Sequence, residues 1–273
     1  MKLHTLPPCE FAWKYIAARL ERNSRVDRRR STTMTCRASG SSPSNLDLTL
    51  QSSFISLCAP AANSHGCIAV VKHLKAEDKV EIINAYGKTR TPEFLAINPC
   101  HTCPTLEIND DVAVWESNAI MRHLATTLEG GEDLYPKDPI MRAKIDMVLD
   151  WRQTSLYKNI PDIAYCVFGM PVSHEAAKKN MKELLDEHFP ILLDVYLKDT
   201  PFVYSDKPTI ADLGIAPVLT FIKVRSKFWD AVPDKVKEYH TRVLEAFPGA
   251  KENFDMLDGM ATGYDGEGAD AEP

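Results

Sequence analysis

The chain has 273 residues, of which 44% are hydrophobic and 26% are charged, and this is typical of a globular protein with room for a sizeable core. Its formal net charge of −6 argues against a general nucleic-acid binder, and no window approaches the roughly 18 uninterrupted apolar residues of a membrane-spanning helix. The seven cysteines are scattered without the spacing of a disulfide scaffold, which favours reduced thiols and a cytoplasmic location.

Residues 1–52 differ in composition from the rest of the chain. The first 50 residues hold nine Lys and Arg against four Asp and Glu, and the arginines are mixed with serines. This composition is typical of an organelle transit peptide, and it equally suits a disordered basic extension. Two locations therefore stay open, the cytoplasm and an organelle addressed by residues 1–52.

A small α/β domain is predicted over residues 53–128. Short apolar runs bounded by prolines and polar turns predict strands, and longer runs with helical spacing predict helices. In chain order the predicted elements are strand 54–59, helix 67–75, strand 80–85, strands 105–108 and 112–115, and helix 117–128. This β-α-β and then β-β-α order is that of a thioredoxin-like fold.

A second, all-helical domain is predicted after a linker at residues 129–139, which holds a Gly-Gly pair and two prolines. Hydrophobic residues recur at helical spacing through residues 140–258, and Pro190 inside one such pattern predicts a kink or a break. The predicted fold class is thus an α+β thioredoxin-like domain followed by a helical domain, and residues 259–273 predict an acidic disordered tail.

Thr209 and Asp212 have the spacing of a capping box at the start of an apolar helix over residues 213–222.

Recognition groups concentrate between residues 98 and 120. Cys103-Pro104 offers a backbone edge beside a candidate cis-proline. Glu116 offers a carboxylate for an amine, and Ser117 offers a hydroxyl at a helix N-terminus for a carboxylate. Few ligands other than an amino-acid-like tripeptide match that set.

Three motifs carry a resemblance to a known family. They are TPEFLAINPCHTCPTL at residues 91–106, WESNAIMRHL at 115–124 and KPTIADLGIA at 207–216. With these motifs in order, the chain from about Phe54 to Leu257 resembles a cytosolic glutathione transferase, nearest to the serine-type delta and theta classes. The resemblance implies glutathione as co-substrate, no metal and a homodimer.

The resemblance assigns Ser64 as the catalytic residue, whose hydroxyl would donate a hydrogen bond to the glutathione sulfur. A free thiol with a pKa of about 8.5 is only a few per cent ionised at pH 7, and lowering its pKa by about two units takes roughly 2.7 kcal/mol. A hydrogen bond to a charged acceptor contributes about 1.5–3 kcal/mol, and a helix N-terminus adds to it. Asn63 could assist or replace Ser64, and Ser64 could instead only cap the helix.

The residues implied to bind glutathione are His101, Cys103, Pro104, Glu116, Ser117 and Asp146. His101 would meet the glycine carboxylate, the Cys103 backbone would pair with the cysteinyl unit, and Asp146 would reach the glutamyl amine across the dimer. An ordinary exposed helix carboxylate is the alternative for Asp146. Cys100 and Cys103 form a Cys-x-x-Cys pair, but no second pair lies at zinc-site spacing, so no metal is expected.

The function implied by the resemblance is transfer of the glutathione thiolate to an electrophile, with peroxide reduction as a related activity. The expected partners are glutathione, a small electrophile or peroxide and a second copy of the chain, without nucleic acid or membrane. One alternative is a glutathione-dependent thioltransferase that uses Cys67, because a thiol in the first turn of a helix can have a lowered pKa. The other is a non-catalytic interaction module with the same fold.

Overall fold

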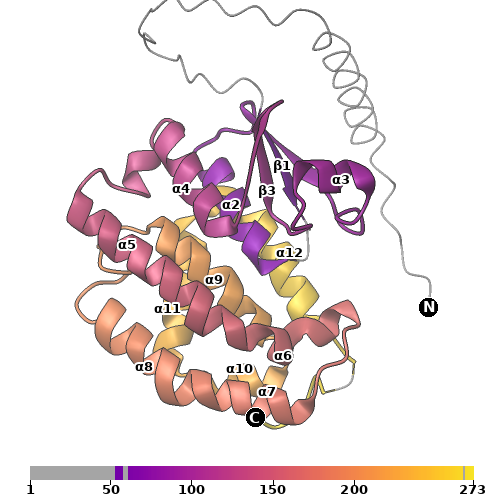
Figure 1. Cartoon of the computed structure of the whole chain (residues 1–273). Coiled ribbons are helices and arrows are strands. Elements are labelled where there is room, and N and C mark those ends of the chain that lie inside the picture. Colours follow the sequence, from indigo (N-terminus) through magenta and orange to yellow (C-terminus); the bar gives the residue numbers. More distant parts are fainter. Residues whose placement is uncertain (1–52, 58–60, 267) are drawn as a thin grey trace, which may run out of the picture.

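The computed structural model describes residues 53–57, 61–266 and 268–273 (Figure 1). The predicted basic extension over residues 1–52 lies outside the described residues. Among the helices that are described, none combines the length and the apolar character needed to cross a membrane.

The N-terminal domain is a four-stranded mixed sheet with helices packed against it. Its strands are β1 (Ser53–Leu57), β2 (Val80–Asn84), β3 (Thr105–Asn109) and β4 (Val112–Trp115). The strand order is β2-β1-β3-β4, with β1 and β2 parallel and the other two pairs antiparallel. Its helices are α2 (Ala62–His73), α3 (Pro92–Ile97) and α4 (Ser117–Thr127). The predicted thioredoxin-like order is confirmed.

Helix α2 begins at Ala62, so the predicted start at residue 67 is wrong. Ala61 has the extended conformation of a helix cap, and the chain turns helical directly after it. The sequence lacks a capping side chain there, which is why the local pattern did not mark this end. The early start places residues 63–66 inside the first two turns of a helix instead of on a loop.

Local hydrogen bonds to side chains explain helix α3 and the turn between β3 and β4. Helix α3 was not predicted, yet the Thr91 side chain accepts a hydrogen bond from Phe94 N at 3.4 Å and Pro92 takes the first turn. The predicted turn between β3 and β4 is confirmed, because Asn109 Oδ1 accepts from the backbone N–H groups of Asp111 and Val112 at 2.9 and 3.0 Å.

The described part of the C-terminal domain is helical apart from one isolated β-bridge between Phe202 and Ser205. Its main helices are α5 (Pro139–Trp151), α6 (Ile160–Ala164), α7 (His174–Glu183), α8 (Phe189–Ile191), α9 (Ile210–Ile222), α10 (Ser226–Ala231), α11 (Asp234–Ala246) and α12 (Lys251–Thr262). Short 3-10 turns lie at Gly131–Asp133, Tyr157–Asn159, Tyr165–Phe168 and Pro248–Ala250, and π-helical turns at Arg152–Leu156, Leu184–His188 and Leu192–Tyr196. Around Pro190 the helix changes between α and π geometry instead of stopping.

Helix α9 is the central helix of this domain, and each of its residues is buried. The predicted capping box is confirmed, since Thr209 accepts from the first turn and Asp212 Oδ2 accepts from Thr209 N at 2.7 Å. Asp212 also accepts hydrogen bonds from Val203 N and from the Tyr239 hydroxyl, at 3.0 and 2.8 Å. One buried carboxylate therefore joins α9, α11 and the loop before α9.

The two domains meet where α2 packs on α9. A Cβ atom at Gly66 would lie 2.8 Å from Leu213 O and 3.0 Å from Met121 Sδ, so only glycine allows this close approach. Nearly every residue of α2 from Ala62 to Val71 is buried. Figure 1 shows α2 and α4 between the sheet and the helical domain, with α3 on the other side of the sheet.

The C-terminal segment packs against the domain. Helix α12 runs to Thr262, beyond the predicted domain end at residue 258. Arg225 Nη1 donates to Gly268 O at 2.7 Å, and Ser226 N donates to Ala269 O at 3.0 Å. The segment predicted as a solvated acidic tail thus makes backbone contacts with the residues just before and within α10.

Candidate functional site

A pocket of about 380 Å³ lies between the two domains. Its residues come from the start of α2, the loop before β3, the start of α4 and the turns that follow α5. They are Ala61, Asn63, Thr89, His101, Thr102, Cys103, Pro104, Glu116, Ser117, Gln153, Tyr157 and Tyr165. The pocket brings together five of the predicted site residues, namely His101, Cys103, Pro104, Glu116 and Ser117.

Asn98 holds the loop that carries three of these residues. It is completely buried, and its amide nitrogen donates to Thr102 O at 3.1 Å and to Thr105 Oγ1 at 2.9 Å. Its Oδ1 accepts from Cys100 N at 2.9 Å. These bonds fix the backbone on both sides of His101, and the Cys103-Pro104 peptide is cis as anticipated. Asn98 is a positioning residue that the sequence analysis missed.

Glu116 and Ser117 sit at the junction of β4 and α4. Ser117 opens the helix and is 5% exposed, with its first-turn N–H groups directed away from the helix body. A helix N-terminus of this kind suits a carboxylate, and the neighbouring Glu116 side chain supplies the opposite charge for an amine. The pair therefore matches the two charged groups of an amino acid.

Two residues of the pocket have backbone strain. His101 has a φ of 47° and Glu116 a φ of 75°, both in the region that favours glycine. Each such conformation costs on the order of 1–3 kcal/mol and is found preferentially at functional sites. Both residues line the pocket.

The helical domain supplies the opposite wall through Gln153, Tyr157 and Tyr165. The two tyrosine hydroxyls lie 2.6 Å apart, within hydrogen-bonding distance. Burial, followed by the interaction with Tyr157, raises the pKa of Tyr165 well above its usual range. Tyr165 thus stays protonated at neutral pH, and this wall combines aromatic surface with two hydroxyl groups.

The structure does not bring Ser64 to the pocket. Because α2 starts at Ala62, Ser64 lies in the first turn and faces the interior, where it is completely buried. Its hydroxyl has no hydrogen-bond partner among the described residues. Asn63, one position earlier, lines the pocket instead.

Behind the pocket lies a buried arginine that the sequence analysis also missed. Arg152 is 1% exposed and begins the π-helical turn after α5. Its guanidinium donates to Gly214 O at 3.0 Å, to Gln153 Oε1 at 2.6 Å and to Asn63 Oδ1, and its carbon lies 4.9 Å from the centre of the Tyr157 ring. Burial lowers the pKa of Arg152 to about 10, so the side chain stays charged at neutral pH.

Cys67 is enclosed within α2. It is completely buried, and its sulfur contacts the backbone oxygens of Asn63 and Ser117 at 3.8 and 3.6 Å. Burial raises the pKa of the Cys67 thiol to about 12, despite the nearby charge of Arg152. A thiol in this state is a poor nucleophile at neutral pH.

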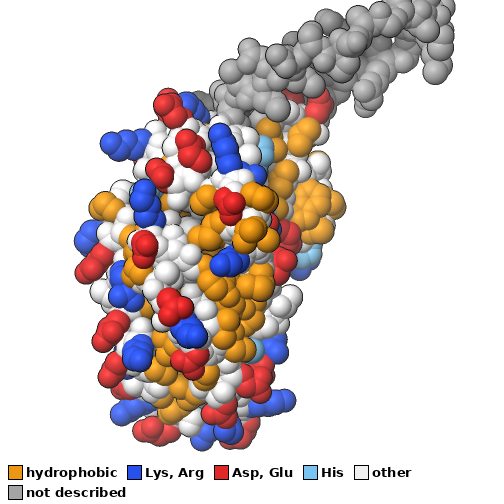
Figure 2. All heavy atoms as spheres, turned by 90° about the vertical axis from the view of Figure 1, so that its left-hand side faces the viewer, with side chains coloured by type: hydrophobic (Ala, Val, Ile, Leu, Met, Phe, Trp, Pro, Cys, Tyr) orange, Lys and Arg blue, Asp and Glu red, His pale blue; other side chains and the backbone are white. Residues whose placement is uncertain are grey.

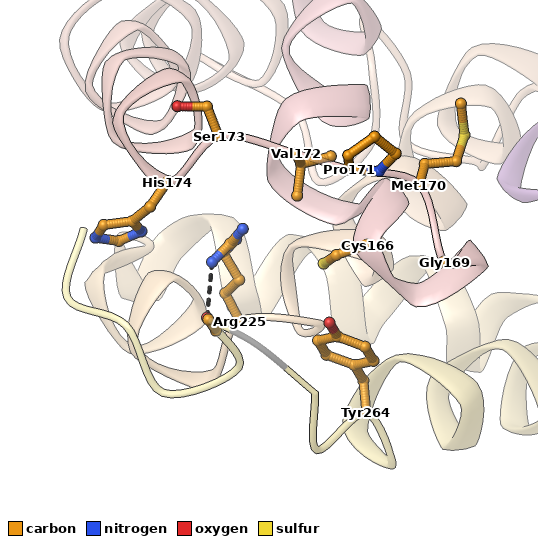
Figure 3. Close-up of a pocket in the computed structure, with 10 residues that line it drawn as sticks. Cys166, Gly169, Met170, Pro171, Val172, Ser173, His174, Arg225 and Tyr264 are labelled. Atoms are coloured by element: carbon orange, nitrogen blue, oxygen red, sulfur yellow. Dashed lines mark hydrogen bonds between the residues drawn. The ribbon is translucent and has the colours of Figure 1, made fainter.

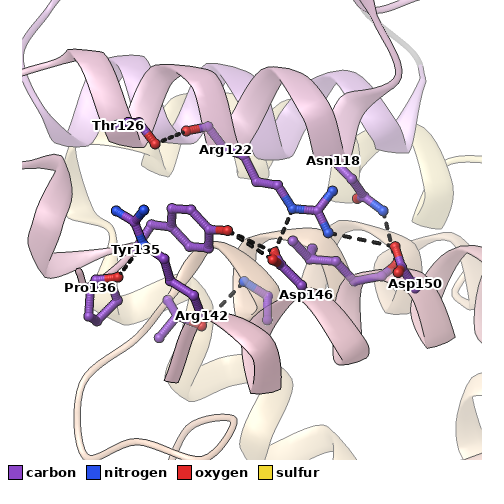
Figure 4. A network of polar contacts seen from close by, with 11 residues as sticks. Asn118, Arg122, Thr126, Tyr135, Pro136, Arg142, Asp146 and Asp150 are labelled. Atoms are coloured by element: carbon purple, nitrogen blue, oxygen red, sulfur yellow. Dashed lines mark hydrogen bonds and ion pairs between the residues drawn. The ribbon is translucent and has the colours of Figure 1, made fainter. Parts of the chain in front are cut away.

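Asp146 lies on α5 outside the pocket, in a polar network with α4 (Figure 4). It accepts from Arg122 Nε at 2.6 Å and from the Tyr135 hydroxyl at 3.0 Å. Burial and then the bond to Asp146 raise the pKa of Tyr135. About 37% of the Asp146 side chain is exposed, so the network leaves part of it open to solvent.

A second cavity of about 550 Å³ lies at the end of the helical domain, next to the C-terminal segment (Figure 3). Cys166, His174, Arg225 and Tyr264 are among its lining residues. It is larger than the interdomain pocket but shares no residue with it, and it contains none of the predicted site residues. The interdomain pocket is therefore the candidate site.

Comparison with known proteins matches both halves of the chain to one family. The profile of the glutathione S-transferase N-terminal domain matches residues 62–127, and that of the glutathione S-transferase C-terminal domain matches residues 174–242. Together the two matches span the main parts of both domains described above.

Solved structures with the same fold include insect and human proteins. A delta-class glutathione transferase of Nilaparvata lugens is 27% identical, with a TM-score of 0.62 over 78% of this chain and 98% of that one. A Bombyx mori glutathione transferase is 25% identical, with a TM-score of 0.64 over 79% and 98%. Human glutathione transferase theta-2, solved in complex with glutathione, is 19% identical, with a TM-score of 0.66 over 80% and 95%, and this likeness concerns the fold.

Proposed function

Because the chain belongs to the glutathione S-transferase family through both of its domains, we propose that its interdomain pocket binds glutathione and activates the thiol for attack on an electrophile. The observation that carries the proposal is the meeting of His101, Cys103, Glu116 and Ser117 in one pocket of about 380 Å³. That volume is in the range of small-ligand sites.

The γ-glutamyl end of glutathione carries an ammonium group and a carboxylate. We assign the carboxylate to the N-terminus of α4 at Ser117, where free N–H groups and a hydroxyl are available. We assign the ammonium group to the Glu116 carboxylate, since charge-assisted hydrogen bonds are stronger than neutral ones. A ligand without either charge would leave one of these groups unpaired.

The middle and far end of the tripeptide would lie along the loop before β3. The backbone of Cys103, next to the cis-proline Pro104, presents an edge for the cysteinyl unit. His101 lines the same pocket and is assigned to the glycine carboxylate. These contacts would place the thiol near the start of α2 and the wall formed by Gln153, Tyr157 and Tyr165.

The proposed chemistry begins with the glutathione thiolate. Its sulfur attacks an electrophilic carbon, a carbon–sulfur bond forms, and the leaving group departs with its electron pair. With a hydroperoxide, the sulfur attacks an oxygen atom, an S–O bond forms as the O–O bond breaks, and the alcohol leaves. A second glutathione then attacks the sulfur of this sulfenic acid, which releases water and forms glutathione disulfide. Holding both reactants in one pocket supplies a large part of the rate through proximity.

A homodimer is proposed on the face that carries α4 and α5. Ile140 and Met147 of α5 are 69% and 46% exposed, and Figure 2 shows a band of hydrophobic side chains on this side of the molecule. Asp146 lies on the same helix between them. In a dimer through this face, its partly exposed carboxylate would be available to the glutathione site of the second copy.

The proposal is tested by turnover of the full chain with glutathione and a panel of electrophiles and hydroperoxides. Glu116→Gln keeps the size of the side chain and removes its charge, and Glu129→Gln is the matched control on an exposed residue just after α4. Loss of a hydrogen bond to a charged group, about 1.5–3 kcal/mol, predicts a rise in the KM for glutathione of about 10- to 100-fold in Glu116→Gln alone. No glutathione-dependent turnover across the panel would contradict the proposed activity and favour a non-catalytic module.

A further inference from the structure

Arg152 holds two amide side chains of the pocket without entering the pocket itself. Its Nη1 donates to Gln153 Oε1 at 2.6 Å, its Nη2 donates to Asn63 Oδ1, and its Nε donates to Gly214 O at 3.0 Å. Asn63 and Gln153 line the interdomain pocket, whereas Arg152 is 1% exposed and does not. The guanidinium thus binds the amide oxygens of Asn63 and Gln153, whose other side-chain atoms line the pocket.

The direction of both amides follows from the chemistry of arginine. A guanidinium group has only donors, so each amide must present its oxygen to Arg152 and not its nitrogen. The NH₂ groups of Asn63 and Gln153 are then left on the pocket side, and among the described residues neither has a recorded hydrogen-bond partner there. Both amides are therefore fixed as donors toward a ligand.

The positive charge of Arg152 also favours a negatively charged group in the pocket. Among the described residues no carboxylate forms an ion pair with Arg152, and the Glu116 carboxylate attracts it only from beyond ion-pair distance, so a buried positive charge lies behind the pocket. Burial makes such a charge strongly felt by neighbouring groups, because little water screens it. Hydrogen bonds from a cation also polarise the amides, which strengthens the bonds that their NH₂ groups donate.

We propose that Asn63 and Gln153, oriented and polarised by Arg152, are the donors that stabilise the glutathione thiolate in this protein. The inference rests on the proposed binding of glutathione in this pocket. Asn63 and Gln153 would contact the sulfur, and Arg152 is a positioning residue that acts through both. The buried hydroxyl of Ser64 has no part in this arrangement, because it faces the interior beside the same helix turn.

The test is a pH titration of the bound thiol in the full chain, followed by the ultraviolet absorption of the thiolate. A donor to a charged acceptor is expected to lower the thiol pKa by about one to two units. Asn63→Asp keeps the size of the side chain and an oxygen for Arg152 but removes the NH₂ group and adds a negative charge. It should raise the pKa of the bound thiol by at least about one unit.

Gln153→Glu makes the same change on the opposite wall and serves as the independent variant if Asn63→Asp is unstable. Arg152→Lys keeps the charge but loses the planar fork whose separate N–H groups bond Asn63, Gln153 and Gly214, so it too should raise the thiol pKa. Ser64→Ala should leave the thiol pKa as in the wild type. Retained binding of S-methylglutathione, which has no thiol to ionise, shows for each variant that the site is intact.

The outcomes separate the two proposals. Wild-type protein that binds neither glutathione nor S-methylglutathione would overturn the proposed function and this inference with it. If S-methylglutathione binds normally, the pKa of the bound glutathione thiol decides the inference. A pKa that changes in Ser64→Ala, but not in Asn63→Asp or Gln153→Glu, would overturn this inference alone. We expect the pKa of the bound thiol to rise in Asn63→Asp, Gln153→Glu and Arg152→Lys. We expect no change of that pKa in Ser64→Ala.

Discussion

Cys67 gives a sharp test of which thiol does the chemistry. With a pKa of about 12, only about one part in 100,000 of this thiol is ionised at pH 7, against about 3% for a thiol at the ordinary value of about 8.5. The nucleophilic form is thus about 3,000-fold rarer than in an exposed cysteine. The complete burial of the side chain slows any reagent further.

The assay is alkylation of the native full chain with iodoacetamide, read peptide by peptide by mass spectrometry. Cys100 is exposed and serves as the internal reference. We expect native Cys67 to react at least about 1,000-fold more slowly than Cys100, and both to react at similar rates in denaturant. Cys67→Ser should keep glutathione-dependent turnover.

Native labelling of Cys67 within about tenfold of Cys100 would refute the reasoning, because it would require an accessible and partly ionised thiol. Loss of glutathione-dependent disulfide exchange in Cys67→Ser, with that exchange retained in Asn63→Asp, would instead support the thioltransferase alternative.

Three further predictions concern stability, each measured by denaturant or thermal unfolding. Asp212→Ala leaves buried donors without an acceptor and should lower the free energy of unfolding by about 3 kcal/mol or more; a loss below about 1 kcal/mol would contradict this. Gly66→Ala forces a Cβ atom to 2.8 Å from Leu213 O and should cost about 1–3 kcal/mol, whereas Gly259→Ala, with nothing within 4 Å, should be neutral or stabilising. Burial, with a smaller effect of Lys223, lowers the pKa of His240 from 6.5 to about 3. Protonation of His240 therefore favours the unfolded chain, and the free energy of unfolding should fall as the pH drops from about 6.5 to about 3. His240→Gln, which keeps a polar group near Thr220, should flatten that pH dependence, and an unchanged slope would show that other groups cause it.

The residues of the proposed binding half of the site could be located from sequence because their motif is local. Glu116 and Ser117 follow a short strand and open an amphipathic helix, and the cis-proline Pro104 lies in the same stretch. Chain neighbours decide these positions, so spacing and residue type suffice. The same holds for the capping box at Thr209, where two side chains within one turn complete each other's hydrogen bonds.

The residues proposed to activate the thiol could not be predicted in the same way, because tertiary contacts decide their positions. The start of α2 lacks a capping side chain, and a shift of that start moves Ser64 inward and Asn63 to the pocket. Arg152 follows an amphipathic helix, where the pattern indicates a solvent-exposed charge. Its burial and its hydrogen bonds to Gly214 of α9 and Asn63 of α2 arise only in the folded structure.

The central claim is that the interdomain pocket binds glutathione through the charges at the start of α4. Isothermal titration calorimetry of the full chain with glutathione measures this directly. We predict one site per chain in the wild type and in Glu129→Gln, and an affinity about 10- to 100-fold weaker in Glu116→Gln. Absence of binding in the wild type, or equal affinity in Glu116→Gln and the wild type, would contradict the claim.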